Sequence, residues 1–271
     1  MISPMIRDDR VFKPGQGMEV VVMTRITGRR RRLLVSGGLT VAFLLITGLL
    51  VLTKVIRITP LFAGRYPVHG VDVSHYQGEI DWEVLSGQDI RFAYIKATEG
   101  SRYVDQQFSR NWDQAGQTEL LTGAYHFFSF DSSAQTQAEL YIRTVGDLSG
   151  KLAPVVDVEY YGDKRAHPPD KDAVVAELTG LLQLLEAHYQ IRPVIYTTYP
   201  FYDRYIAGSF DDYPLWIRNV YYPPDLDGKH PWVFWQYTDT AVLDGYQGDE
   251  RYIDMDVFCG TEEELGTFLV P

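Results

Sequence analysis

Apolar residues follow two different patterns along the chain. From Leu33 to Thr53 none of the 21 residues is charged, and Leu, Val, Ile, Phe and Ala dominate. As a helix this stretch would span about 31 Å, close to the roughly 30 Å hydrocarbon thickness of a bilayer. After Pro67 the pattern changes to short apolar segments that alternate with amphipathic ones. The pattern predicts one transmembrane helix followed by a folded domain.

The folded part contains eight strand-like segments, and the first five are separated by predicted helices. The clearest helix is Asp172–Tyr189, in which leucines recur at helical spacing. Alternation of strands and helices predicts parallel strands, whereas Pro- and Gly-rich segments between the last three leave little room for helices. We therefore expect an α/β fold, an irregular (β/α) barrel with eight strands and about five helices, shorter than the regular form. The predicted strands are Gly70–Ser74, Phe92–Ala97, Thr122–Phe128, Pro154–Glu159, Pro193–Thr197, Leu215–Asn219, Val233–Tyr237 and Ile253–Phe258.

The basic residues before the apolar run predict its orientation. Arg29–Arg32 lies directly before it, and the positive-inside rule then places the N-terminus in the cytoplasm and the folded domain across the membrane. A cleaved signal peptide is the alternative, but its apolar region is shorter and ends in a small-x-small site, which is missing here. We expect a basic cytoplasmic tail at 1–32, a signal anchor at 33–56, a linker at 57–68 and a barrel domain at 69–271. Met18 and Met23 are alternative starts.

Charge is distributed unevenly between the two parts. The net charge is −11, yet residues 1–66 carry eleven Lys/Arg and three Asp/Glu, so the remainder is strongly acidic. Such a domain argues against binding nucleic acid through its phosphates. The only cysteine, Cys259, excludes an intramolecular disulfide, and we expect it to be a small buried residue.

Two carboxylates interrupt the most apolar of the predicted strands. Asp157 and Glu159 are two residues apart in Ala153–Tyr160, so both side chains leave the same face of the strand. Acids on an apolar strand cost free energy unless they are paired or used, and a solvated edge strand is the alternative. In a barrel, Asp72, Asp157, Glu159 and Asp254 would each lie near the catalytic carboxyl end of a strand.

Six motifs, in order, resemble family 25 glycoside hydrolases, the Chalaropsis-type lysozymes, over about residues 69–260. Asp157-Val-Glu159 matches the Asp-x-Glu strand of that family. The other matches are Gly70–Gly78 with Ile80–Trp82 behind it, Tyr94–Gly100, Gly123–Phe127, Trp235–Tyr237 and Ile253–Phe258. Relatives cleave the β-1,4 bond between N-acetylmuramic acid and N-acetylglucosamine in peptidoglycan. The resemblance implies a muramidase, and the predicted signal anchor would place it at the bacterial inner membrane, with its barrel in the periplasm or outside the cell.

The resemblance also implies roles for the acids. Glu159 is then the general acid, and Asp72, Asp157 and Asp254 are the other catalytic carboxyls. Asp157 would orient the acetamido group of the substrate for attack on the anomeric carbon; a water-activating base in an inverting mechanism is the alternative. Asp256 departs from the Asn expected in many relatives and adds a carboxylate near the site.

Aromatic and basic side chains are candidates for substrate binding. Sugar rings pack on aromatic faces, and the polar tips of Tyr and Trp bind hydroxyls. The candidates are Tyr125, Tyr196, Trp216 and Trp235, with Lys96, which either binds substrate or pairs with an acid across the barrel, and Asp256. We expect no metal and no cofactor, and as partners the peptidoglycan glycan strands and, through the helix, the lipid bilayer; the catalytic domain is expected to be monomeric. A noncatalytic glycan-binding protein and a glycosidase for another N-acetylated glycan such as chitin are the alternatives.

Overall fold

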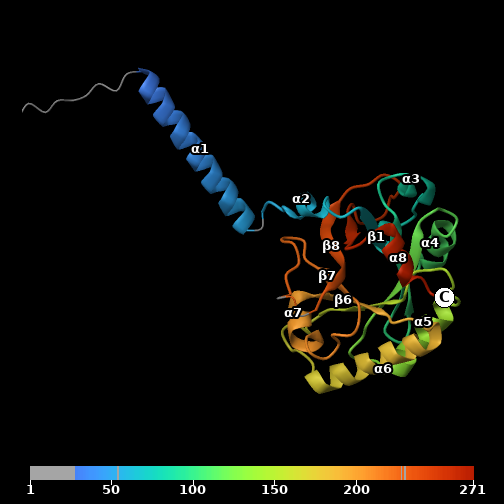
Figure 1. The fold of residues 1–271 in the computed structure, drawn as a ribbon. Helices are drawn as coiled ribbons and strands as arrows, with labels where there is room; N and C mark the ends of the chain where they lie inside the picture. The colour runs from blue at the N-terminus through green and yellow to red at the C-terminus, as the bar shows by residue number, and fades with distance from the viewer. Residues whose placement is uncertain (1–27, 54, 227, 229) are drawn as a thin grey trace, which may run out of the picture. The chain divides into compact units, whose positions relative to one another are not determined.

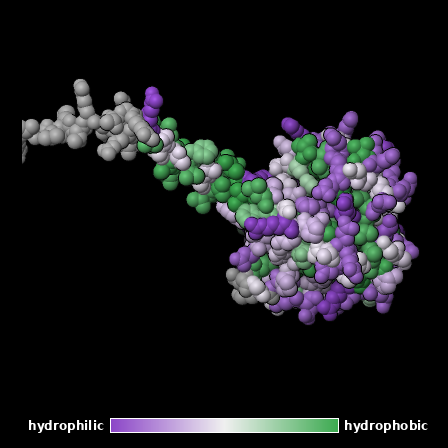
Figure 2. Space-filling view, turned by 45° about the horizontal axis from the view of Figure 1, so that its top comes forward, coloured by the Kyte–Doolittle hydropathy of each residue, from purple (hydrophilic) through white to green (hydrophobic). Residues whose placement is uncertain are grey.

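The apolar segment forms one long helix, α1 (Gly28–Leu52). A computed structural model describes residues 28–53, 55–226, 228 and 230–271, so most of the predicted tail lies outside the described residues. Within α1, Val35–Leu52 is long and apolar enough to cross a bilayer by length and composition. Figure 2 shows apolar side chains along the surface of this helix. The predicted helix is confirmed; its role as an anchor stays a prediction.

The chain from Thr53 onward forms a separate unit, a closed barrel (Figure 1). Eight strands follow one another around it in the order β1-β2-β4-β5-β6-β7-β8-β9, and β9 pairs with β1 to close the ring. The short β3 (Tyr103–Val104) pairs only with β2. This confirms the predicted eight-stranded barrel. The barrel strands are β1 (Val68–Val73), β2 (Phe92–Glu99), β4 (Leu121–Phe127), β5 (Val155–Val158), β6 (Val194–Thr198), β7 (Leu215–Arg218), β8 (Trp232–Ala241) and β9 (Ile253–Phe258).

Strand direction in the ring changes only at the last strand. The strands from β1 to β8 that form the ring are parallel, whereas β9 runs antiparallel to both neighbours. Among the described residues, the segments between β7 and β8 and between β8 and β9 both lack a helix, yet only the second joins antiparallel strands. Helices occupy the five crossovers that precede β7: α3 (Trp82–Ser86), α4 (Phe108–Ala115), α5 (Ala134–Val145), α6 (Lys171–Tyr189) and α7 (Tyr199–Phe201), which continues into a π-helical turn at Tyr202–Ile206. Short 3-10 turns at His75–Gln77 and Gly266–Phe268 and α8 (Glu262–Leu265) complete the fold.

Aromatic side chains fill the barrel interior below its carboxyl end. Tyr94 packs against Trp216 and Phe234, with ring centroids 5.1 and 5.8 Å apart, and Phe92 lies 5.3 Å from Phe234. Gly123 leaves room for this layer, because a Cβ there would lie 2.2 Å from the Tyr94 ring. We call Phe92, Tyr94, Trp216 and Phe234 the aromatic floor. It gives whatever lies above it a dry, apolar base.

A short helix, α2 (Thr59–Ala63), covers the outside of β8. Thr59 and Ala63 are buried, so the range 57–68, where we expected a linker, carries ordered contacts with the barrel. Cys259, expected to be buried, is exposed because it follows the last residue of β9, where the chain leaves the sheet.

Candidate active site

Four of the predicted acids meet at the carboxyl end of the parallel strands. Asp157 lies in β5 and Glu159 directly after it, so alternation along the strand turns both toward the interior. Asp72 of β1 is the direct cross-strand partner of Asp254 in β9. All four line one cavity above the aromatic floor.

Asp254 reaches this cavity for a reason that differs from our expectation. We placed it near the carboxyl end of a strand, but it is the second residue of β9. Because β9 is antiparallel to β1, its first residues lie beside the last residues of β1. The reversal of the last strand therefore brings Asp254 into the catalytic face.

A hydrogen-bond network ties Asp72 to the barrel wall. Gln236 donates from Nε2 to Asp72 Oδ2 at 2.7 Å, and Tyr196 donates its hydroxyl to Gln236 Oε1 at 2.9 Å. Asp256 forms a side-chain hydrogen bond with Asp72, and its Oδ1 accepts from Trp216 Nε1 at 2.9 Å. These bonds fix the orientation of the Asp72 carboxyl.

Burial above the aromatic floor raises the pKa of each of these acids. Desolvation raises the pKa of Asp157 and of Asp256 well above the ordinary value, and the negative charges of neighbouring carboxyls raise both further. Desolvation, then the nearby Asp72, raises the pKa of Asp254 to about 9. The pKa of Asp72 rises only to about 6, because hydrogen bonds from Gln236 and Asp256 offset its burial. At neutral pH, Asp72 is thus ionised beside an Asp254 that keeps its proton.

Glu159 has the environment of a general acid. Desolvation raises its pKa, the Arg218 guanidinium opposes this, and Asp72 adds to the rise. A carboxyl with a raised pKa is suited to protonating a leaving group.

Asp157 has an oxygen without a partner. Its Oδ1 is buried and accepts no hydrogen bond from the described residues, although the residue lines the cavity. Buried polar atoms in folded proteins nearly always find a partner. The arrangement leaves this oxygen for a group that enters the cavity.

Two basic side chains face the acids. Lys96 Nζ lies 2.7 Å from Glu99 Oε2 on its own strand, so its ion pair does not cross the barrel as one of our alternatives had it. A register shift in β2 between Lys96 and Thr98 brings Glu99 to the same side. Arg218, at the end of β7, pairs with Asp239 of β8.

The predicted aromatic residues separate into two groups. Tyr125, Tyr196 and Trp216 line the cavity with Lys96. Trp235 lies on the opposite face of β8, fully buried in a cluster with Ala63 and Tyr237, and donates to Asn219 O at 2.8 Å. The structure therefore places Trp235 outside the cavity. Asp256, predicted to bind substrate, has no exposed surface and is linked to the cavity through its hydrogen bonds with Asp72 and Trp216.

Sequence reasoning missed Gln236 and Arg218. Alternation along the strands could have found both, because residues two apart share a face. Arg218 is two residues after Trp216, and Gln236 is two after Phe234, and both of those belong to the aromatic floor. Tyr76, which follows β1 and lines the cavity, was also missed.

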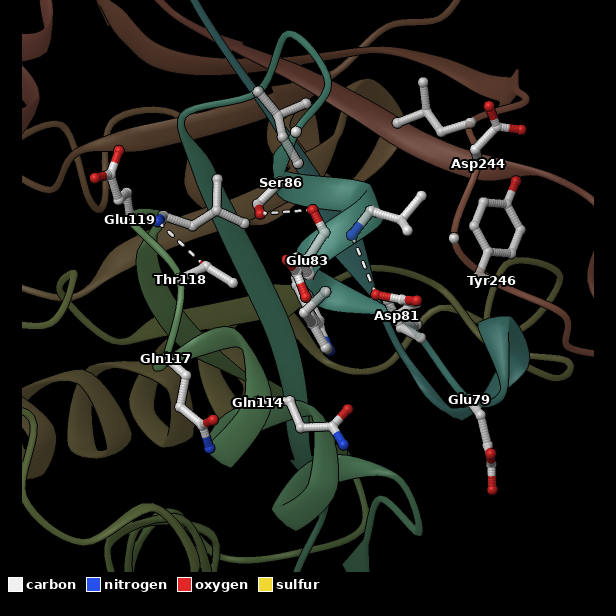
Figure 3. A pocket seen from close by; sticks show the side chains of 18 of the residues that line it. Glu79, Asp81, Glu83, Ser86, Gln114, Gln117, Thr118, Glu119, Asp244 and Tyr246 are labelled. Carbon is white, nitrogen blue, oxygen red and sulfur yellow. Dashed lines mark hydrogen bonds between the residues drawn. The ribbon is translucent and has the colours of Figure 1, made fainter.

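A larger hollow lies elsewhere, beside α3 and the end of α4 (Figure 3). Its polar groups serve local structure: Asp81 accepts from the Val84 amide as a helix cap, and Ser86 donates to Glu83 O. It contains none of the predicted site residues. Within the described residues, no group of three or more His, Cys, Asp or Glu side chains is placed to hold a metal ion.

Comparison with known proteins identifies the family. The model of glycosyl hydrolases family 25 matches residues 71–246. The chain belongs to this family. It is a glycoside hydrolase, and Asp254 and Asp256 lie just beyond the matched range.

Solved structures and curated relatives agree with this family. A family 25 glycosyl hydrolase from Bacillus anthracis is 48% identical, with a TM-score of 0.72, over 75% of this chain and 94% of that one. A bacterial lysozyme from Streptomyces coelicolor has a TM-score of 0.67 and 30% identity, over 74% and 96%. Lysozyme M1 of Streptomyces globisporus is 33% identical over 73% of this chain and 70% of its own, and the uncharacterised YegX of Escherichia coli K12 is 40% identical over 75% and 74%.

Proposed function

We propose that this family 25 hydrolase is a muramidase that cleaves the β-1,4 bond between N-acetylmuramic acid and N-acetylglucosamine in peptidoglycan. The observation that carries the proposal is the cluster of Asp157, Glu159, Asp72 and Asp254 above a dry aromatic floor. Lysozyme M1 and the lysozyme from S. coelicolor, by their names, point to the same substrate.

Glu159 protonates the glycosidic oxygen of the leaving sugar. Its pKa, raised first by burial, favours the protonated form that a general acid needs. Asp72, ionised and held by Gln236, supports the positive charge that develops at the anomeric carbon. Asp254, which keeps its proton, presents a hydroxyl donor to the sugar.

Asp157 manages the acetamido group of the substrate. Its unpartnered Oδ1 is suited to accept the acetamido N–H, which orients the acetamido oxygen toward the anomeric carbon. This route forms the bond from the acetamido oxygen while the bond to the leaving oxygen, protonated by Glu159, breaks; water then opens the cyclic intermediate. It retains the anomeric configuration, whereas a water-activating Asp157 would invert it.

Product analysis tests the substrate. The full chain is incubated with purified peptidoglycan, and new reducing ends are identified by mass spectrometry. Muramic acid at those ends is the expected result, and glucosamine ends would show a different bond specificity. Binding without cleavage would indicate a noncatalytic glycan-binding protein, and cleavage of chitin alone another glycosidase. NMR of the first-formed anomer separates retention from inversion.

We also infer that α1 anchors the enzyme in the cytoplasmic membrane, with the N-terminus in the cytoplasm. Arg29–Arg32 before the apolar segment supports this orientation. A C-terminal alkaline phosphatase fusion, active only outside the cytoplasm, should be active. Activity of a fused cytoplasmic reporter instead would reverse the topology, and a mature protein that begins after α1 would indicate cleavage.

A further inference from the structure

The segment that follows α1 is part of the catalytic end of the barrel. We call residues 57–66 the strap. Arg57 donates to Asp239 Oδ1 and, at 3.3 Å, to Thr240 Oγ1, and its guanidinium lies 5.5 Å from the centre of the Tyr221 ring. Thr59, fully buried, donates to Val220 O at 3.3 Å. The strap is thus fixed to β8 and to the segment after β7.

Asp239 connects the strap to the active site. Its Oδ1 accepts from Arg57, and its Oδ2 accepts from Arg218. Asp239 lines a hollow at the mouth of the site together with Asp72 and Asp254. Each oxygen of this carboxylate is therefore held by a different guanidinium, one from the strap and one from β7.

We propose that Arg57 is a positioning residue of the active site, which holds Asp239 and through it Arg218 beside the catalytic carboxyls. This inference rests on the proposed function, because it names a residue outside the family motifs that acts on the general acid. It assigns a catalytic consequence to the segment next to the apolar helix. A segment that served only as a flexible tether would need length and flexibility alone. The strap instead contains a buried residue, Thr59, and an arginine, Arg57, that binds Asp239 at the mouth of the site.

The charges around the general acid set the direction of the effect. Three side chains act on Glu159 most directly: Arg218 lowers its pKa and Asp72 raises it, while Lys96 lowers it. Other ionisable groups that face Glu159 or Arg218 are Asp157, Tyr196, Asp239 and Asp254. The group Arg57–Asp239–Arg218 carries a net charge of +1, and loss of Arg57 makes it neutral. Less positive charge near the carboxyls raises the pKa of Glu159.

The sign of the kinetic shift follows from the role of Glu159. A general acid works only while it is protonated. A higher pKa of Glu159 therefore moves the alkaline limb of the pH–rate profile to higher pH. For a charge on the order of 10 Å away in a partly solvated site, the expected shift is about 0.5 pH unit. Asp239→Asn removes a negative charge and leaves two unpaired cations, so it moves the same limb downward.

The test compares full-chain variants in one detergent. Initial rates on labelled peptidoglycan are measured from pH 4 to 9 for wild type, Arg57→Gln, Arg57→Lys, Asp239→Asn and Arg65→Gln. Arg65 is the matched control, because it lies on the same strap but packs on the Phe62 ring at 5.1 Å. Arg57→Gln should shift the limb upward, Arg57→Lys by less than half as much, and Arg65→Gln not at all.

A second readout separates this inference from the proposed function. In chains with carboxyl-13C-labelled glutamate, the Glu159 resonance, assigned through Glu159→Gln, reports its pKa without any substrate. An upward shift of this pKa in Arg57→Gln supports the inference even if peptidoglycan is not cleaved. Equal pKa values in wild type and Arg57→Gln, or equal shifts in Arg57→Gln and Arg65→Gln, would overturn it.

Discussion

Asp256 offers a test of how the carboxyl cluster holds its protons. The side chain is fully buried; Oδ1 accepts from Trp216, and Oδ2 has no N–H or O–H donor among the described residues. Its hydrogen bond with Asp72 requires one of the two carboxyls to carry a proton. We assign the proton to Asp256, since burial and neighbouring charges raise its pKa well above the ordinary value. Asp256→Asn then keeps both hydrogen bonds, because an amide accepts from Trp216 and donates to Asp72 without titrating.

The magnitude comes from proton linkage. Asp in the unfolded chain has a pKa of about 3.9. Above this pH, and up to the raised pKa in the folded state, folding must take up a proton at Asp256. Wild-type stability therefore falls as pH rises through this window, by up to about 1.4 kcal/mol per pH unit for this group. The free energy of unfolding of Asp256→Asn minus that of wild type should be near zero at pH 4 and increase with pH.

Urea unfolding at pH 4, 5, 6 and 7, in one detergent, measures this difference. Asp256→Leu is the contrasting variant, because it leaves the buried Trp216 N–H without an acceptor and loses about 1–3 kcal/mol from that change. A difference between Asp256→Asn and wild type that stays flat from pH 4 to 7 would refute the assigned proton. If Asp256→Asn instead becomes less stable relative to wild type as the pH rises, Asp256 is ionised in the folded state and its charge is stabilised there.

Three further predictions test the site and the aromatic floor beneath it. Glu159→Gln should lower kcat on peptidoglycan by about 10²–10⁴-fold with little change in thermal midpoint, and full activity would exclude Glu159 as the acid. Gln236→Leu removes a donor that lowers the pKa of Asp72, so the pKa should rise above about 6 and the acidic limb of the pH–rate profile should move upward; an unmoved limb would contradict the role of ionised Asp72. Gly123→Ala places a Cβ 2.2 Å from the Tyr94 ring and should cost about 1–3 kcal/mol in urea unfolding, and unchanged stability would show that the floor can yield.

The strands were predictable because their signals are local. β-branched and apolar runs, separated by helical periodicity among the first five strands and by Pro- and Gly-rich segments among the last, predicted every strand of the ring; among the described strands, only the two-residue β3 was missed. The face of each residue was less predictable, because strands of a barrel are buried on both sides and both sets of alternate residues are apolar. Trp216 and Trp235 look equivalent in the sequence, yet one belongs to the aromatic floor and the other packs outside β8 against Ala63.

The protonation of the acids depends on contacts between strands distant in sequence. Asp72 and Asp254 are the same residue type, are cross-strand partners and are both desolvated, but their pKa values are about 6 and about 9. Asp72 accepts a hydrogen bond from Gln236, which is 164 positions away, whereas the described residues supply no comparable donor to Asp254. Hydrogen bonding to the charged form of Asp72, together with the negative charges of Asp72 and Asp239 beside Asp254, therefore decides which acid ionises. That difference places the negative charge at Asp72, near Glu159, whose own pKa is raised, and only the closed barrel determines it.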